Sequence, residues 1–194
     1  MKFIISVFIG LFLVQSSLIA DTKLVEKNFL EAINKIELTI KEKTLSKDER
    51  NKKVIEIIEP QFDFELMAKL SLAKKWKSLQ TDVRKEFVEL YVNRMKKSYS
   101  SKLDAYQDEK FIVSGIKQPK ATRIFLESKI QSGTDDFEIV YKYYKPKKPI
   151  ENKKQWLIYD VEIFGVSILK TDRAQFSEYL KTHTLNDLMK SMKE

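Results

Sequence analysis

The sequence predicts an α+β domain in which a helical amino-terminal half packs on an antiparallel sheet of about four strands, with further helices at the carboxyl terminus. The first observation behind this prediction is that the spacing of apolar residues changes from three or four to two after Tyr106. The second is that the segments with the two-residue period follow one another with short connections, which is typical of antiparallel pairing. The third is length, because residues 21–194 suffice to bury one core without disulfides.

Residues 1–20 differ in composition from the rest of the chain. Lys2 precedes an apolar run over residues 3–14, and Ala20 ends a short segment of the kind at which leader peptides are cut. We therefore expect residues 1–20 to be a cleavable signal peptide and residues 21–194 to be a single exported domain. An uncleaved anchor is the alternative, but the run is shorter than the roughly 20 residues that span a bilayer.

Four helices are predicted before Tyr106. The first covers residues 25–40 and has one apolar stripe, formed by Val25, Phe29, Ile33, Ile36 and Ile40. The second begins at the capping box Ser46-Lys47-Asp48-Glu49 and ends before Pro60. The third covers residues 62–72. The fourth begins at Thr81, and its apolar positions recur four residues apart at Val83, Phe87, Tyr91, Met95 and Tyr99.

Four strands and two short helices are predicted after Tyr106. The strands are predicted over residues 111–116, 122–131, 137–143 and 156–164. In the second and third of them apolar and polar residues alternate, which is the pattern of a sheet with one solvated face. Ser132-Gly133-Thr134-Asp135 has the composition of a hairpin turn. The last two helices are predicted to begin at Thr171 and Thr184.

The residue inventory excludes several kinds of site. The four Gly residues are too far apart for a Gly-rich phosphate loop. The absence of Cys and the single His183 exclude the usual zinc sites and most catalytic triads. The formal net charge is +8, but the lysines are interspersed with acidic residues and the chain is predicted to be exported, so we expect no nucleic-acid partner. We expect no metal and no catalytic residue.

The segment from Trp156 to Phe176 resembles the signature of the MlaC family, also called the toluene-tolerance family. After the Trp it contains Tyr159-Asp160-Val161, then Gly165-Val166-Ser167, and then Arg173-Ala174-Gln175-Phe176. The helical half is similar to the family in residues 62–68 and in the aromatic end of the long helix, so the resemblance covers nearly all of residues 22–190. The chain departs from it at Lys170-Thr171-Asp172, where an Asn and a Tyr more often precede the Arg.

The resemblance implies a periplasmic phospholipid carrier that has no enzymatic activity and no cofactor besides its bound phospholipid cargo. It implies that the sheet is curved and encloses an apolar lipid cavity with the helices. The implied partners are an outer-membrane lipoprotein of the MlaA type and an MlaD-type MCE protein of an inner-membrane ABC transporter. The implied role is to maintain the lipid asymmetry of the outer membrane, and we expect the carrier to be a monomer.

A carrier of this kind needs a dry cavity, because exposing some thirty acyl methylenes to water costs on the order of 20 kcal/mol. The helical residues expected to line the cavity are Phe64, Met67, Phe87, Tyr91, Met95 and Tyr99, and the strand residues are Tyr141, Tyr143, Tyr159, Val161 and Ile163. Apolar residues at these spacings also fit a filled core. Arg173 is a candidate head-group contact, and the alternative is a structural contact with Asp160 or with backbone carbonyls.

Two other functions are kept open. A secreted adaptor without a lipid ligand would have a filled core and would bind a protein through its sheet or through the basic segment 145–154. An esterase would need a nucleophile, but Ser167 lacks the second Gly of a hydrolase elbow.

Overall fold

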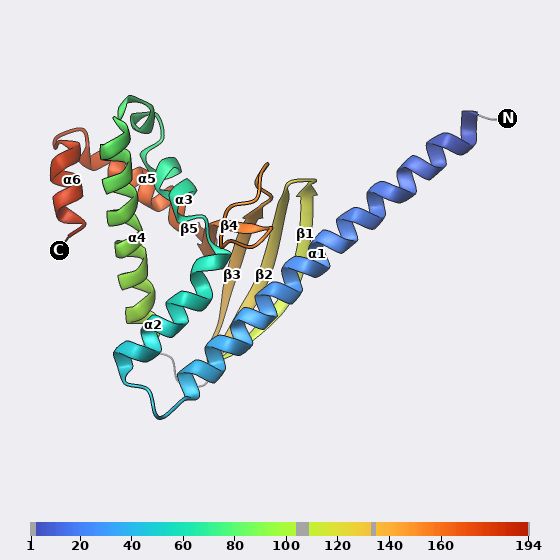
Figure 1. Ribbon diagram of the computed structural model, residues 1–194, viewed down its shortest axis with the longest axis horizontal. Coiled ribbons are helices and arrows are strands. Elements are labelled where there is room, and N and C mark those ends of the chain that lie inside the picture. Colours follow the sequence, from blue (N-terminus) through green and yellow to red (C-terminus); the bar gives the residue numbers. More distant parts are fainter. Residues whose placement is uncertain (1–2, 104–108, 133–134, 194) are drawn as a thin grey trace.

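The computed structural model describes residues 3–103, 109–132 and 135–193. In these residues it contains six α-helices, two short 3₁₀ helices and one open antiparallel sheet of five strands. Figure 1 shows α1 lying across the sheet, while α3, α4, α5 and α6 gather beside β4 and β5. The predicted α+β class is therefore confirmed.

Helix α1 (Phe3–Lys41) is much longer than the predicted helix over residues 25–40. Its amino-terminal part projects away from the domain in Figure 1. Among the described side chains, Asp21 is the first to bond to the sheet side of the fold, since its carboxylate accepts hydrogen bonds from Lys145 Nζ and Trp156 Nε1, each at 3.2 Å. In the described residues, no helix combines a membrane-spanning length with sufficient hydropathy.

The local signals for the next helices are visible in the structure. Helix α2 (Lys47–Ile58) begins at the predicted capping box, where Ser46 Oγ accepts from Glu49 N at 3.3 Å and the Glu49 carboxylate accepts from Ser46 N at 2.9 Å. The 3₁₀ helix η1 (Glu59–Gln61) contains Pro60. Helix α3 (Phe64–Leu72) begins two residues later than predicted, because the Asp63 carboxylate caps it by accepting from Leu66 N at 2.8 Å. The 3₁₀ helix η2 (Lys75–Ser78) leads to α4 (Thr81–Leu103).

The strands lie in the sheet in the order of the sequence. They are β1 (Lys110–Lys120), β2 (Arg123–Ser132), β3 (Asp135–Tyr144), β4 (Leu157–Ile163) and β5 (Val166–Ser167). Ser132 pairs with Asp135 at the predicted hairpin, and the two turn residues between them lie outside the described residues. β5 was not predicted, because two residues are too few to show a period.

Helix α5 (Ile168–Tyr179) follows β5 directly and begins three residues before the predicted start at Thr171. Ser167 is its N-cap, because Ser167 Oγ accepts from Lys170 N at 3.0 Å and donates to the Asp160 carboxylate at 2.8 Å. Asp160 also accepts from Leu169 N at 3.1 Å, which joins β4 to the start of the helix. Helix α6 (Leu185–Ser191) begins after Thr184, as predicted.

The helices beside β4 and β5 form a closely packed core of their own. The rings of Phe87, Tyr91 and Phe176 lie with centroids 6.1 to 6.4 Å apart. The Tyr91 hydroxyl donates to Asp172 at 2.7 Å, and Arg94 Nη2 lies 2.6 Å from the other oxygen of the same carboxylate. A buried carboxylate thus joins α4 to α5 at the edge of the aromatic cluster.

Candidate ligand cavity

An apolar cavity of about 540 Å³ lies between α1, the end of α2 and one face of the sheet. Pockets for small ligands usually measure roughly 300–1,000 Å³, so this space is large enough for a substantial ligand. Its lining consists of Phe29, Ala32, Ile33, Ile36, Ile58, Gln61, Phe62, Glu109, Phe111, Ile130, Phe137, Ile139, Tyr141, Tyr143, Ile158, Val161, Ile163 and Ile168. Apart from Gln61, Glu109 and the two tyrosine hydroxyls, every lining side chain is hydrocarbon.

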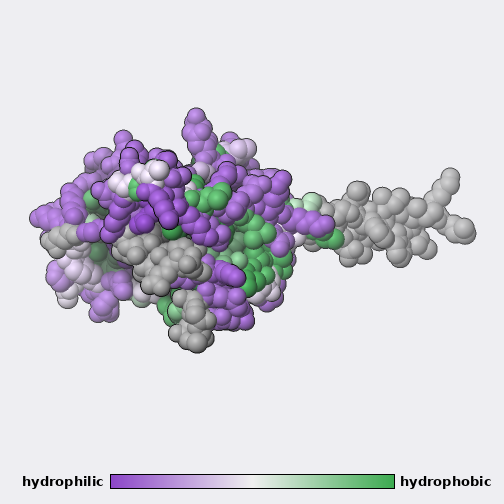
Figure 2. Space-filling view, turned by 90° about the horizontal axis from the view of Figure 1, so that it is seen from below, coloured by the Kyte–Doolittle hydropathy of each residue, from purple (hydrophilic) through white to green (hydrophobic). Residues whose placement is uncertain are grey.

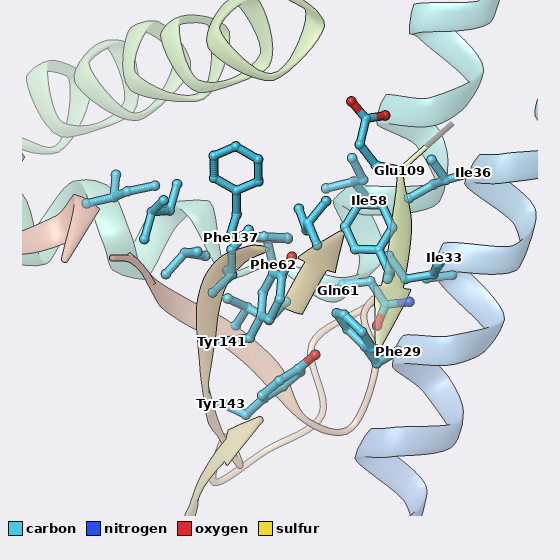
Figure 3. A pocket seen from close by; sticks show the side chains of 18 residues that line it. Phe29, Ile33, Ile36, Ile58, Gln61, Phe62, Glu109, Phe137, Tyr141 and Tyr143 are labelled. Atoms are coloured by element: carbon cyan, nitrogen blue, oxygen red, sulfur yellow. The ribbon is translucent and has the colours of Figure 1, made fainter. Parts of the chain in front are cut away.

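Helix α1 forms one wall of the cavity. Phe29, Ile33 and Ile36 lie four and three residues apart, so they share a face of the helix. Figure 3 shows them opposite Phe137 and Tyr141 of β3. The rings of Phe29 and Tyr141 meet with centroids 4.9 Å apart. The side of the molecule from which α1 projects also shows a group of hydrophobic side chains on an otherwise largely hydrophilic face (Figure 2).

Strand β3 forms the floor of the cavity, because alternate side chains along a strand point to the same face of the sheet. Ile139, Tyr141 and Tyr143 line the cavity, and the intervening Lys142 lies on the opposite face of the sheet. There the Lys142 ammonium lies 3.3 Å from the Asp160 carboxylate and also contacts Glu162. The charged groups of this part of the sheet are therefore kept on the face away from the cavity.

A bulge in β4 changes which of its residues face the cavity. Tyr143 is paired with Ile158 and Lys142 with Asp160, so Tyr159 is an extra residue between the two pairs. Ile158 and Val161 both line the cavity as a result, together with Ile163. Tyr159 was predicted to line it by simple alternation. It lies instead under Arg123, whose Cζ is 4.9 Å from the ring centroid, beside Tyr144.

The helical residues predicted to line the cavity lie elsewhere. Phe64, Met67, Phe87, Tyr91 and Met95 are all buried, but they belong to the core of α3 and α4 and are absent from the lining. The reason is that α3 and α4 pack on each other, and α3 on α5, whereas α1 contacts β1 and lines the cavity together with Ile58 at the end of α2. The side chain of Tyr99 lies outside the described part of α4. The predicted strand residues Tyr141, Tyr143, Val161 and Ile163 do line the cavity.

Arg173 and the other singled-out polar residues lie away from the cavity. The Arg173 side chain is exposed on α5, and Asp160 is engaged by Lys142 and Ser167 rather than by Arg173. Ser167 is the N-cap described above, and His183 stacks on Tyr179 at a centroid distance of 4.2 Å. Among the described residues, no group of His, Asp and Glu is arranged to hold a metal ion.

Burial controls the protonation of the cavity tyrosines. Desolvation raises the pKa of Tyr141 to about 12, although a hydrogen bond with Ser128 acts in the opposite direction. Desolvation also raises the pKa of Tyr143 well above its ordinary value. Both hydroxyls therefore keep their protons, and the floor of the cavity stays uncharged over the physiological pH range.

Sequence reasoning did not assign α1 to the cavity, although the apolar stripe of α1 was recognised. The same stripe contains the cavity residues Phe29, Ile33 and Ile36, so it was the available signal, but a stripe alone does not show which surface it covers. Phe62 and Ile158 were also missed. They meet through an isolated bridge between residues far apart in the sequence, and no local pattern shows such a bridge.

Comparison with known proteins identifies a family and solved structures of similar fold. The sequence profile of the family described as MlaC protein matches residues 28–194. The fold is similar to that of a phospholipid-binding protein from Ralstonia solanacearum, solved in complex with a phospholipid, with a TM-score of 0.72 and 16% sequence identity. That similarity covers 86% of this chain and 93% of the other. Comparison with curated protein sequences gives no match.

Proposed function

Because the chain belongs to the MlaC family, we propose that it is a carrier that binds a phospholipid in the cavity between α1 and the sheet. The proposal extends to a periplasmic location, reached through removal of residues 1–20 as a signal peptide. The carrier exchanges lipid with an MlaA-type outer-membrane lipoprotein and with an MlaD-type MCE protein of an inner-membrane ABC transporter. In this role it maintains the lipid asymmetry of the outer membrane without catalysing a reaction.

The observation that carries the proposal is the apolar cavity itself. A bilayer lipid leaves its membrane at little net cost only if its acyl chains enter surroundings as apolar as the membrane interior. The cavity meets this condition, because α1, the end of α2 and four strands each contribute hydrocarbon side chains to its lining. The charged network of Lys142, Asp160 and Glu162 lies on the other face of the sheet, so it does not compete with the acyl chains.

The open side of the fold also suits reversible uptake. The sheet is not closed into a barrel, and α1 covers the cavity as a separate wall connected to the sheet mainly through β1. A movement of one helix then changes access to the cavity without breaking the hydrogen bonds between strands. The neighbour from Ralstonia solanacearum, which has this fold, was solved with a phospholipid bound.

The test is to purify the protein without detergent and to identify extracted lipids by mass spectrometry. We expect phospholipid in stoichiometric amount. Ile36→Glu places a carboxylate in the cavity wall and should abolish lipid recovery, because the charge cannot be solvated beside acyl chains. Leu38→Glu is the matched control, since Leu38 lies on the same helix and is 64% exposed. Protein that is reproducibly free of lipid would instead favour a non-catalytic adaptor.

A further inference from the structure

Two polar side chains in the cavity wall have no hydrogen-bond partner within the described part of the chain. Gln61 is 9% exposed and Tyr143 is 2% exposed, and both line the cavity. The Tyr141 hydroxyl differs from them, because it is hydrogen-bonded to Ser128. Both side chains line the cavity, so a ligand there can supply the hydrogen bonds that the chain does not.

The pairing of the strands brings the two side chains to the same part of the cavity. Phe62 bridges Ile158, and Ile158 lies opposite Tyr143. Gln61 immediately precedes Phe62, so its backbone lies about two strand spacings, roughly 10 Å, from that of Tyr143. The long side chains of glutamine and tyrosine can converge across this distance. In the view of Figure 3 the Gln61 amide and the Tyr143 hydroxyl both lie beside the Phe29 ring.

The side chains of Gln61 and Tyr143 are suited to a neutral hydrogen-bond acceptor. A tyrosine hydroxyl donates one hydrogen bond, and a glutamine amide offers two donors and a carbonyl acceptor. Neither side chain carries a charge, since desolvation keeps the Tyr143 hydroxyl protonated by raising its pKa. A phosphate group would call for a cation, whereas a neutral carbonyl needs only donors of this kind.

We propose that Gln61 and Tyr143 form a hydrogen-bonding subsite for the carboxylic ester group of the bound lipid. The inference rests on the proposed function, and it adds a position for the polar end of an acyl chain. Since an ether oxygen is a much weaker acceptor than an ester carbonyl, the carrier selects ester-linked over ether-linked lipids of equal chain length and head group. An ether-linked lipid leaves both side chains unpaired.

The test is a competition between two phosphatidylcholines that differ only in their linkages. The lipid-free protein is incubated with vesicles containing equal amounts of the diester and diether forms, and the bound lipids are quantified by mass spectrometry. We expect about a tenfold preference for the diester, which corresponds to one or two net hydrogen bonds. Equal recovery from the native protein would overturn the inference and would indicate that water alone satisfies the two groups.

Variants locate the source of the preference. The double variant Gln61→Met with Tyr143→Phe keeps the side-chain volumes and removes the polar groups, so its preference should fall close to one. Tyr141→Phe is the control, and it should keep the preference of the native protein because the Tyr141 hydroxyl is already bonded to Ser128. Uptake of the diether lipid by the double variant shows that its fold and cavity are intact.

The remaining outcomes are also decisive. An ester preference that survives in the double variant would overturn the inference, because the selection would then arise elsewhere. Failure of the native protein to take up either lipid would overturn the proposed function, and the inference would fail with it.

Discussion

Replacement of Ala32 by leucine tests whether the space between α1 and the sheet is hollow. Ala32 is 9% exposed and lines the cavity. Leucine adds three carbon atoms, and burying each stabilises the fold by about 0.8 kcal/mol, which gives an upper limit of about 2 kcal/mol. In a filled core the same enlargement costs about 1–3 kcal/mol, because side chains and backbone must shift. The two situations therefore predict opposite signs.

The chain offers a matched control in Ala68, which is also an alanine within a helix. Ala68 is 0% exposed and belongs to the core of α3, away from the cavity. Urea unfolding of the lipid-free proteins measures the free energy of unfolding of each variant. We expect Ala68→Leu to lower it by about 1–3 kcal/mol and Ala32→Leu to leave it unchanged or raise it. Ala32→Leu should also reduce the amount of phospholipid recovered.

Equal destabilisation by the two variants would refute the reasoning. The side chains around Ala32 would then already fill the space in solution, and no volume would remain for acyl chains. An increase in stability that occurs without any loss of recovered lipid would show that the ligand occupies a different part of the molecule.

Three further predictions follow from the polar groups. Asp172→Asn removes the carboxylate that pairs with Arg94 and accepts from Tyr91, and it should lower the free energy of unfolding by about 2 kcal/mol in urea titration. Burial raises the pKa of Tyr141 to about 12. In a near-ultraviolet absorbance titration, Tyr141 should therefore ionise at a higher pH than exposed tyrosines. The stability that the neutral Tyr141 hydroxyl contributes to the fold should be lost as the pH rises from about 10 to 12. Hydrogen bonds from the Ser46 side chain and backbone lower the pKa of Glu49 from 4.5. The α2 cap should therefore persist above that value and be lost as the pH falls below it, which NMR titration of the Glu49 carboxyl measures.

Each of these predictions has an internal comparison. Glu178→Gln removes an exposed ion pair with Lys181 and should change the free energy of unfolding by less than about 0.5 kcal/mol. An equal loss in Glu178→Gln and Asp172→Asn would show that burial of the Asp172 carboxylate does not strengthen its interactions. An ordinary titration midpoint for Tyr141 would mean that water reaches its hydroxyl. A midpoint for Glu49 at or above 4.5 would show that the capping box does not form in solution.

The local elements of the fold were predictable because their signals lie within a few residues of one another. The apolar stripe of α1, the capping box at Ser46 and the alternation in β3 each specify a backbone conformation and a buried face. The same alternation placed Tyr141 and Tyr143 on one side of the sheet, where the structure shows them lining the cavity.

The cavity wall was less predictable, because it depends on which helix packs on which face of the sheet. Phe87 and Tyr91 have the spacing of a buried stripe, and so does Phe29, but spacing does not say that α4 packs on helices while α1 covers the sheet. The bulge at Tyr159 is also not specified by the sequence, since no Gly or Pro marks it and the continuous apolar run over residues 156–159 does not show which residue is extra. Its consequence is visible only once the pairing with Tyr143 is known.

The contacts of Asp21 limit how far the amino terminus can be trimmed. A protease that cuts after Ala20 leaves Asp21 as the first residue of the mature chain, and its carboxylate still accepts from Trp156 Nε1 and Lys145 Nζ. A cut one residue later removes that carboxylate, and the buried indole of Trp156 loses this acceptor. The cavity wall formed by α1 would then lose these two polar contacts with Lys145 and Trp156. The position of the cut would thus determine how firmly α1 is held against the sheet side of the fold.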